Sequence, residues 1–286
     1  MSELNGNTGF IGAGNMAEAI ISGLLRSGLS RPEHLLASDV SESRRGYMAE
    51  KFGIETIEDN ISVFARSDLI LLAVKPQHMD GVLEAIANNP AYTVSRRKIV
   101  VSIAAGVPIR KIEGRLYPPL DEKTRSRLPV IRVMPNTPAL VRAGMAGMAG
   151  NEHAKKEDMG RVRTILSAIG KVIEFRESDL DAVTALSGSG PAYLFYLVES
   201  LVAAGLSMGL AEADSLRLTL ETIKGSVKLM EKTGEPADLL RRKVTSPGGT
   251  TEAAFKVLEA HGVKEAVVEA LHAAANRSGE LSGRTS

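Results

Sequence analysis

The chain has 286 residues, which is enough for one large domain or two ordinary ones. Its 35 basic and 34 acidic residues nearly cancel, so it lacks the broad positive field of a nucleic-acid-binding protein. The absence of cysteine excludes disulfides, thiolate zinc sites and cysteine nucleophiles, and it suits a reducing compartment. The N-terminus resembles no targeting signal, and the longest uncharged run, 182–198, is short for a membrane span. We therefore expect a cytoplasmic protein whose partners include neither nucleic acid nor a membrane.

Short apolar runs alternate with helical patterns in the first half of the chain. The sequence predicts helices at 16–26, 42–52 and 60–66, and strands at 8–12, 34–38, 53–57, 68–74, 98–104 and 129–135, with an edge strand at 171–175. Strands of this length separated by helices are typical of βαβ units and a largely parallel sheet. The polar, proline-rich segment 116–129 is expected to be a surface loop.

Helical periodicity takes over after about residue 177, and no further strand is predicted. Apolar residues recur at helical spacing in 191–208 and in 214–232. Residues 187–190, Ser-Gly-Ser-Gly, are expected to form a turn, with Pro191 in the first turn of the next helix. The predicted fold is therefore an α/β domain, residues 1–176, followed by an all-helical domain, residues 177–286.

A glycine motif, Gly12-x-Gly14-x-x-Ala17, stands where the first predicted strand meets the first helix. Gly12 would allow a tight turn, Gly14 would admit a pyrophosphate to the backbone, and Ala17 would let helix and strand pack closely. The alternative is a purely structural glycine turn. The βαβ context favours dinucleotide binding, which makes the first domain Rossmann-type.

The end of the second strand bears on the choice of dinucleotide. Asp39 would bind the ribose diol of NAD, whereas Ser38 with Arg44 or Arg45 would hold the 2′-phosphate of NADP. Alternatively, Asp39 only caps the helix that follows. The residues alone leave these three interpretations open.

Two later strand ends would complete the crevice, because ligands of open α/β sheets bind at the carboxyl ends of the strands. Lys75 follows one strand and would meet phosphate or ribose, unless it is only a solvated loop lysine. Ala104, Ala105 and Gly106 follow the other strand. They are small enough for a flat ring to approach their backbone, although small residues also serve tight packing.

In a second loop, "VTSPGGTTEAAFKVLEA" at 244–260, glycine and hydroxyl residues directly precede a predicted helix. Such a loop exposes backbone N–H groups at a helix N-terminus and suits an anion. The alternative is an ordinary turn with Thr251 as N-cap. Thr251 is not followed by Glu or Gln at the capping-box position, where Ala254 stands, so the motif adds no support for the cap.

No general acid is evident in the helical half. The helix expected at 191–208 contains neither lysine nor histidine. The chain's five histidines are scattered and adjoin none of these loops, so none receives a role, and no pair has metal-ligand spacing. Reduction of a ketone leaves an alkoxide that needs a positioned acid, whereas a cyclic imine can arrive already protonated. The chemistry favours an imine without excluding a ketone.

Six blocks resemble the signature motifs of the pyrroline-5-carboxylate reductase family: "FIGAGNMAEAI", "AVKPQ", "VSIAAGV", "RVMPNTPALV", "DAVTALSGSGPAY" and "VTSPGGTTEAA". They occur in the family's order, and the resemblance extends from about residue 8 to residue 280. It implies NAD(P)H-dependent reduction of 1-pyrroline-5-carboxylate to L-proline, the last step of proline biosynthesis. It also implies a Rossmann domain followed by a helical dimerisation domain, in homodimers or higher homo-oligomers.

The resemblance also implies site residues, and no metal. Its substrate positions are Glu177, Ser246, Gly249, Thr250 and Thr251, and the Thr251 hydroxyl would meet the ring nitrogen as the catalytic group. The second loop would then hold the substrate carboxylate. Its cofactor positions are Ile11, Gly12, Ala13, Gly14, Asn15, Met16, Ser38, Asn60, Ala73, Val74, Lys75, Pro76, Ile103, Ala104 and Ala105.

Two departures from the family's pattern are visible. Val133 replaces a cysteine found in many members, a change that apolar packing should tolerate. Asp39 follows the serine that meets the 2′-phosphate in the family, so it opposes NADPH; we expect NADPH, with NADH possible. Two other functions remain open: a related reductase acting on another imine or a keto acid, and a dinucleotide-sensing protein without turnover.

Overall fold

The computed structural model describes residues 6–283, and these form two compact units. The first unit contains the described residues up to Ser189 and those from Ala274 onward, and the second contains Gly190–Ala273. Residues 177–189 and the end of the last helix therefore pack with the sheet, although the sequence analysis assigned them to the helical domain.

An eight-stranded sheet forms the centre of the first unit, in the order β3-β2-β1-β4-β5-β6-β7-β8. All neighbouring strands are parallel except β6 and β7. This order, with the crossover beside β1, places the carboxyl ends of β1, β2, β4 and β5 along one edge, where ligands of open α/β sheets bind. The strands are β1 (Thr8–Ile11), β2 (Leu35–Ser38), β3 (Glu55–Ile57), β4 (Leu69–Leu72), β5 (Ile99–Ser102), β6 (Val130–Met134), β7 (Gly144–Gly150) and β8 (Gly170–Glu174).

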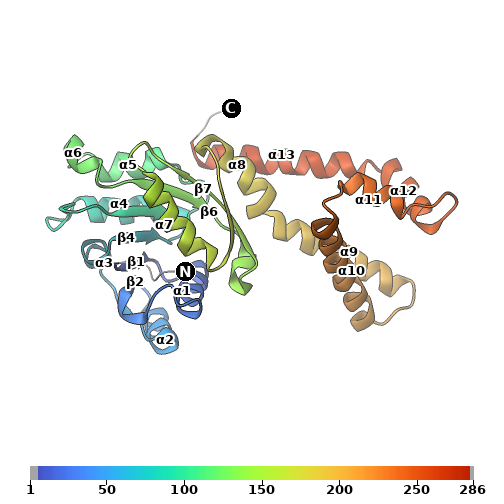
Figure 1. Ribbon diagram of the computed structural model, residues 1–286, viewed down its shortest axis with the longest axis horizontal. Helices are drawn as coiled ribbons and strands as arrows, with labels where there is room; N and C mark the ends of the chain where they lie inside the picture. The colour runs from blue at the N-terminus through green and yellow to red at the C-terminus, as the bar shows by residue number, and fades with distance from the viewer. Residues whose placement is uncertain (1–5, 284–286) are drawn as a thin grey trace. The chain divides into compact units, whose positions relative to one another are not determined.

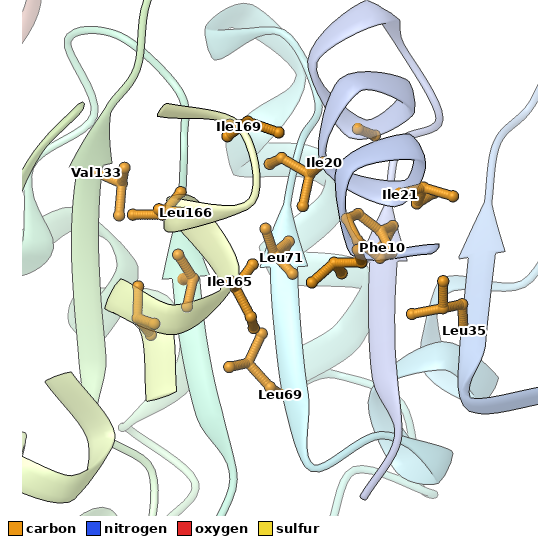
Figure 2. Close-up of a cluster of buried hydrophobic side chains, with 14 of the residues drawn as sticks. Phe10, Ile20, Ile21, Leu35, Leu69, Leu71, Val133, Ile165, Leu166 and Ile169 are labelled. Carbon is orange, nitrogen blue, oxygen red and sulfur yellow. The ribbon is translucent and has the colours of Figure 1, made fainter. Parts of the chain in front are cut away.

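Helices cover both faces of this sheet, because successive strand residues point to opposite sides. Phe10 and Leu71 belong to one buried cluster, and their neighbours Ile11 and Ile70 belong to another. In Figure 2, side chains of α1 and α7 lie over Phe10, Leu69 and Leu71. The other face packs against α3, α4 and α5. The helices are α1 (Asn15–Arg26), α2 (Glu42–Phe52), α3 (Asn60–Arg66), α4 (Met79–Ala87), α5 (Ile109–Leu116), α6 (Glu122–Arg125) and α7 (Lys156–Ser167).

The second unit contains helices alone within the described residues, as Figure 1 shows in yellow to red. Gly205 of α9 packs closely on α10, since a Cβ there would lie 2.4 Å from the Ser215 hydroxyl oxygen. Few other side chains of this unit are buried. The helical run 177–207 is long and apolar enough to cross a membrane by length and composition alone. The helices are α9 (Gly190–Ser207), α10 (Glu212–Thr233), α11 (Ala237–Lys243), α12 (Thr250–Ala260) and α13 (Val263–Leu281), the last of which ends in the first unit.

The expected turn at 187–190 is wrong. Helix α8 (Leu180–Val183) continues through a π-helical segment, Thr184–Gly188, directly into α9. The Ser189 N–H donates to the Thr184 carbonyl at 2.8 Å, the wider spacing of a π-helix. Pro191 has no N–H for the Ser187 carbonyl, which instead accepts a hydrogen bond from the Asn136 side chain at 3.3 Å. The helix is thus retained because a side chain replaces the missing donor.

Two other expectations need correction. Strand β7, "GMAGMAG", was missed because glycine and alanine have low strand propensity. Gly144 and Gly170 are needed there, since a Cβ on Gly170 would lie 2.0 Å from the Gly144 carbonyl oxygen. Segment 116–129 is not merely a surface loop: it contains α6, and Leu120 and Leu128 are buried in the core.

Candidate active site

The first glycine loop is held at the carboxyl ends of β1, β2 and β4. The Gly12 N–H donates to the Ser38 carbonyl, and the Ala73 N–H donates to the Ile11 carbonyl, both at 2.8 Å. Gly12 has a φ of +94°, and a Cβ there would lie 2.8 Å from the carbonyl carbon of Ala73. Glycine is therefore required for this approach of the loop to the end of β4.

Gly14, in contrast, faces open space, since a Cβ there would meet no atom within 4 Å. It is the N-cap of α1, and no side chain caps the N–H groups of the first turn. An exposed helix N-terminus without a protein cap suits an anionic ligand. The loop fits a pyrophosphate in this respect.

A cavity of about 590 Å³ adjoins this loop. Its wall includes some of the predicted cofactor residues: Gly12, Gly14, Ser38, Asn60, Ala73, Val74 and Lys75. The other predicted cofactor residues lie outside the cavity wall: Ile11, Ala13, Asn15, Met16, Pro76, Ile103, Ala104 and Ala105. Ile11 and Ala13 are buried, so their backbones rather than their side chains would face a ligand.

Part of this wall was not predicted from the sequence: Val40, Gln77, His78, Gly81 and Val82. The expectation that no histidine adjoins a site loop is wrong for His78. A short 3-10 helix, Pro76–His78, directly follows the loop that carries Lys75, and it brings His78 into the wall. In the sequence, the signal for His78 was its position three residues after Lys75.

Ser38 is fully buried, and its hydroxyl donates to the Asn60 side-chain oxygen at 2.7 Å. This hydrogen bond fixes the carboxamide with its oxygen toward Ser38, which leaves the amide donors of Asn60 for a ligand in the cavity. Ser38 therefore acts on the cavity through Asn60 in this arrangement, rather than by exposing its own hydroxyl.

Asp39 is tied to the glycine loop. Its carboxylate accepts hydrogen bonds from the N–H groups of Ala13 and Ser41, each at 2.9 Å. The interpretation of Asp39 as the cap of the next helix is wrong, because Ser41 is the N-cap of α2 and accepts from the Arg44 N–H at 3.3 Å. The carboxylate also belongs to the cavity wall.

The two arginines considered for a 2′-phosphate already have protein partners. Arg44 donates to the Ala13 carbonyl and to Glu18, and Arg45 donates to the Asp39 carbonyl at 2.7 Å. Burial raises the pKa of Glu18, but hydrogen bonds from Lys51, Arg44 and Tyr47 outweigh it and lower the pKa to about 2. Arg44 therefore links the glycine loop, through the Ala13 carbonyl, to the Glu18 carboxylate of α1. The lowered pKa keeps that carboxylate ionised.

The second anion loop lies in the second unit. The Gly249 N–H donates to the Ser246 carbonyl at 3.0 Å, and Gly248 has a φ of +71°. Gly249, not Thr251, is the N-cap of α12, so the interpretation of Thr251 as an N-cap is wrong. The N3 residue of α12 is then Glu252, whose carboxylate accepts from the Gly248 N–H at 2.6 Å.

This arrangement leaves the start of α12 available to a ligand. No side chain caps its first turn, and Thr251 is half-buried, with a hydroxyl that makes no hydrogen bond to another group within residues 6–283. The remaining predicted substrate residue, Glu177, belongs to the first unit, where its side chain accepts from the Ile109 N–H at 2.7 Å. The cofactor residues and the loop at 246–251 thus belong to different units, each with its own anion-ready helix start.

Comparison with known proteins gives matches along nearly the whole chain. A family model described as pyrroline-5-carboxylate reductase dimerisation matches residues 177–281, and one described as NADP oxidoreductase, coenzyme F420-dependent, matches residues 7–106. A pyrroline-5-carboxylate reductase from Pseudomonas aeruginosa is 42% identical over 274 residues, which cover 95% of each chain.

Two solved structures agree. The pyrroline-5-carboxylate reductase from Coxiella burnetii has a TM-score of 0.86 and 36% identity, covering 98% of this chain and 99% of that chain. The pyrroline carboxylate reductase from Plasmodium falciparum, solved with NADP bound, has a TM-score of 0.85 and 31% identity, covering 98% of this chain and all, 100%, of that chain. On the sequence identity, the coverage and the fold together, this chain belongs to the pyrroline-5-carboxylate reductase family.

Proposed function

We propose that the protein reduces 1-pyrroline-5-carboxylate to L-proline with a hydride from NADPH. The observation that carries the proposal is the pair of helix starts without protein caps, one at Gly14 beside the cavity and one at Gly249. One suits the pyrophosphate of a dinucleotide and the other suits the carboxylate of a small substrate. Membership of the family supports the assignment of substrate and reaction.

The dinucleotide would be held mainly by the backbone of the first glycine loop and by Asn60. Backbone N–H groups of residues 14–16 would meet the pyrophosphate, and the Asn60 amide, oriented by Ser38, would donate to the adenosine ribose or its 2′-phosphate. Lys75 would approach the same anionic groups. The bound dinucleotide supplies the hydride, and Ile103, Ala104 and Ala105 would form the surface beneath its nicotinamide.

The substrate would be held by the second loop. The N–H groups of Thr250 and Thr251, with the Ser246 hydroxyl, would bind the carboxylate, and the lack of a side chain at Gly249 would leave room for it. The Thr251 hydroxyl would hydrogen-bond to the ring nitrogen and so orient the C=N bond. The imine carbon gains the hydride, and the nitrogen carries the proton it brought as an iminium or takes one through Thr251. Glu177 would complete the substrate site.

The family model for dimerisation covers the helical region, and the protein is a homo-oligomer that acts on a small molecule. We infer a homodimer at least, with 177–286 as the domain that builds it and 1–176 as the cofactor domain. A cytoplasmic location without membrane or nucleic-acid partners is part of the same proposal, and the absence of cysteine supports it.

The assay that tests this function follows NADPH oxidation with 1-pyrroline-5-carboxylate, together with the proline formed. One proline should appear for each NADPH consumed, and a panel of keto acids should give rates at least 100-fold lower. Faster turnover of a keto acid would favour the related reductase. NADPH binding without oxidation by any imine would favour the dinucleotide-sensing protein.

A further inference from the structure

The end of α13 packs against the loop that follows β5. This loop, residues 103–108, starts with the proposed nicotinamide positions Ile103, Ala104 and Ala105. Gly106 has a φ of +69°, and a Cβ there would lie 3.0 Å from the Leu281 Cβ. Just beyond the loop, the Arg110 side chain donates to the carbonyls of Ser282 and Gly283, each at 3.0 Å. These contacts all lie within the first unit.

A buried polar cluster also connects the end of α13 to this part of the first unit. Arg132 of β6 is 1% exposed, and its guanidinium lies 3.6 Å from Glu177 and 3.5 Å from Asp181. Ser278 of α13, also buried, donates its hydroxyl to Asp181 at 2.9 Å. The cluster therefore ties the last helix of the chain to the central sheet through one cation and two carboxylates.

Glu177 extends this cluster to the loop itself. Its side-chain oxygen lies near Arg132 and accepts the N–H of Ile109, the first residue of α5, at 2.7 Å. The loop has no strand or helix structure between β5 and α5. Its first part is held by the core, because Ala104 and Val107 are buried and the Ile103 N–H donates to the Leu72 carbonyl at 3.2 Å. Gly106 against Leu281, and the Ile109 N–H on Glu177, hold the loop from its other side.

We propose that the end of α13, through Arg110 and Ser278, positions the loop on which the nicotinamide rests. These residues touch neither substrate nor cofactor, so they are positioning residues, and this role rests on the proposed dinucleotide site. Adenosine and pyrophosphate are assigned to other segments, namely Asn60 at the start of α3 and the loop between β1 and α1. Loosening the end of α13 should therefore weaken the hold on the nicotinamide half alone.

The test compares two ligands on the full-length protein. Arg110→Met keeps the apolar stem and removes both hydrogen bonds to the end of α13. We expect the Kd for NADPH to rise roughly 3- to 10-fold, the effect of losing hydrogen bonds to a charged donor. The Kd for 2′,5′-ADP, which lacks the nicotinamide half, should stay within about twofold. Arg115→Met is the matched control, because it removes a guanidinium from the same helix whose ion pairs, among residues 6–283, are with Asp80 and Glu84 alone.

Ser278→Ala gives an independent test that keeps α13 helical. It should lower kcat with 1-pyrroline-5-carboxylate and raise the Kd for NADPH, again without changing 2′,5′-ADP binding. Ser167→Ala is its control, because in the described part of the chain that hydroxyl bonds only to the Thr164 carbonyl of its own helix. Equal weakening of both ligands, or a lower Tm with unchanged NADPH binding, would overturn the positioning role. A wild-type protein that binds both ligands but makes no proline would overturn the proposed function while leaving this comparison valid.

Discussion

The two units of this chain bury their apolar side chains to very different extents. In the first unit, clusters on both faces of the sheet are buried almost completely, and residues such as Phe10, Ile20 and Ile70 have no exposed surface. In the second unit, Phe195 is 60% exposed and Tyr196 is 73% exposed, and the same holds for many leucines. An apolar side chain left in water forgoes about 1.5–3 kcal/mol of stabilisation. The first unit thus has a core within one chain. The apolar side chains of the second unit are instead suited to packing against another chain.

This difference explains why the family's dimerisation model covers the helices. Many large apolar side chains exposed on the helices of one unit are typical of an association site. The largest expected effect therefore comes from breaking it. Phe195→Glu should convert the homo-oligomer to a monomer and lower kcat/KM about 100-fold or more, since a buried unpaired charge is strongly unfavourable at an interface.

Sedimentation at micromolar concentration, run beside the NADPH assay, checks this prediction. Val141→Glu is the matched control, because Val141 is 76% exposed but belongs to the first unit. That variant should keep both assembly and activity. An oligomer that survives Phe195→Glu with full activity would place the interface elsewhere.

The next effect concerns the functional loop of the second unit. Thr251→Ala should lower kcat/KM by ~10- to 1,000-fold, the cost of one positioned hydrogen bond in the hydride step. NADPH affinity should hardly change, because the proposed pyrophosphate site is the glycine loop at residues 12–14 of the first unit. Because Gly249 is the N-cap, Thr251→Ala should also leave Tm nearly unchanged.

Gly249→Val separates carboxylate binding from the hydride step in the same loop. A Cβ at Gly249 would lie 3.0 Å from the Ser246 carbonyl oxygen, so the loop must shift. We expect this variant to act mainly on KM, whereas Thr251→Ala acts on kcat as well. Unchanged kcat/KM in Thr251→Ala would remove Thr251 from the active site.

The sequence predicted much of the first unit because its strands are continuous apolar runs bounded by polar residues. β4 and β5 were found in this way, and the glycine loop was found because Gly12 must adopt a positive φ. β7 was missed because its side chains are small. Its stability comes from pairing with β6 and β8, which no local pattern reveals.

The details of the candidate site depend on contacts between segments far apart in the chain. Asp39 bonds to Ala13 only because β1 and β2 are paired in one register, so its role could not be separated from helix capping beforehand. The cap of α12 was misplaced by two residues, because Gly249 gives no side-chain signal. The buried Arg132 cluster was missed since its members come from three segments far apart in the chain: Arg132, residues 177–181 and Ser278.

The ionised Glu18, which accepts a hydrogen bond from Arg44 beside the glycine loop, predicts that the first unit loses stability in acid. Glu18 has a folded-state pKa of about 2, against 4.5 in a model peptide. A lowered pKa contributes stability that is present above the unfolded value and is lost as the pH falls from about 4.5 toward 2. The lowered pKa of Glu18 contributes at most about 3 kcal/mol to the free energy of unfolding.

Glu18→Gln should therefore lower the free energy of unfolding at pH 7 by roughly 1–3 kcal/mol, and the difference from wild type should shrink as the pH falls toward 2. Chemical denaturation at a fixed protein concentration measures this. Glu33→Gln is the control, because its ion pair with Arg31 is exposed and such pairs contribute ~0–1 kcal/mol. A difference that does not depend on pH would mean that packing, not charge, is what Glu18 supplies.

The smallest expected effect is the choice between NADPH and NADH. In the proposed cofactor site, the Asn60 amide would donate to a 2′-phosphate, whereas the Asp39 carboxylate in the same cavity wall would oppose it. Two backbone N–H groups partly offset the charge of Asp39, which weakens its repulsion of a phosphate. We therefore expect a kcat/KM for NADPH about tenfold above that for NADH, since one net hydrogen bond to the phosphate is worth ~1.5 kcal/mol. Asp39→Asn should raise that ratio a further ~3- to 10-fold by removing the remaining charge, and Glu42→Gln, outside the cavity wall on α2, should leave it unchanged. Equal or better efficiency of the wild type with NADH would show that Asp39 outweighs Asn60.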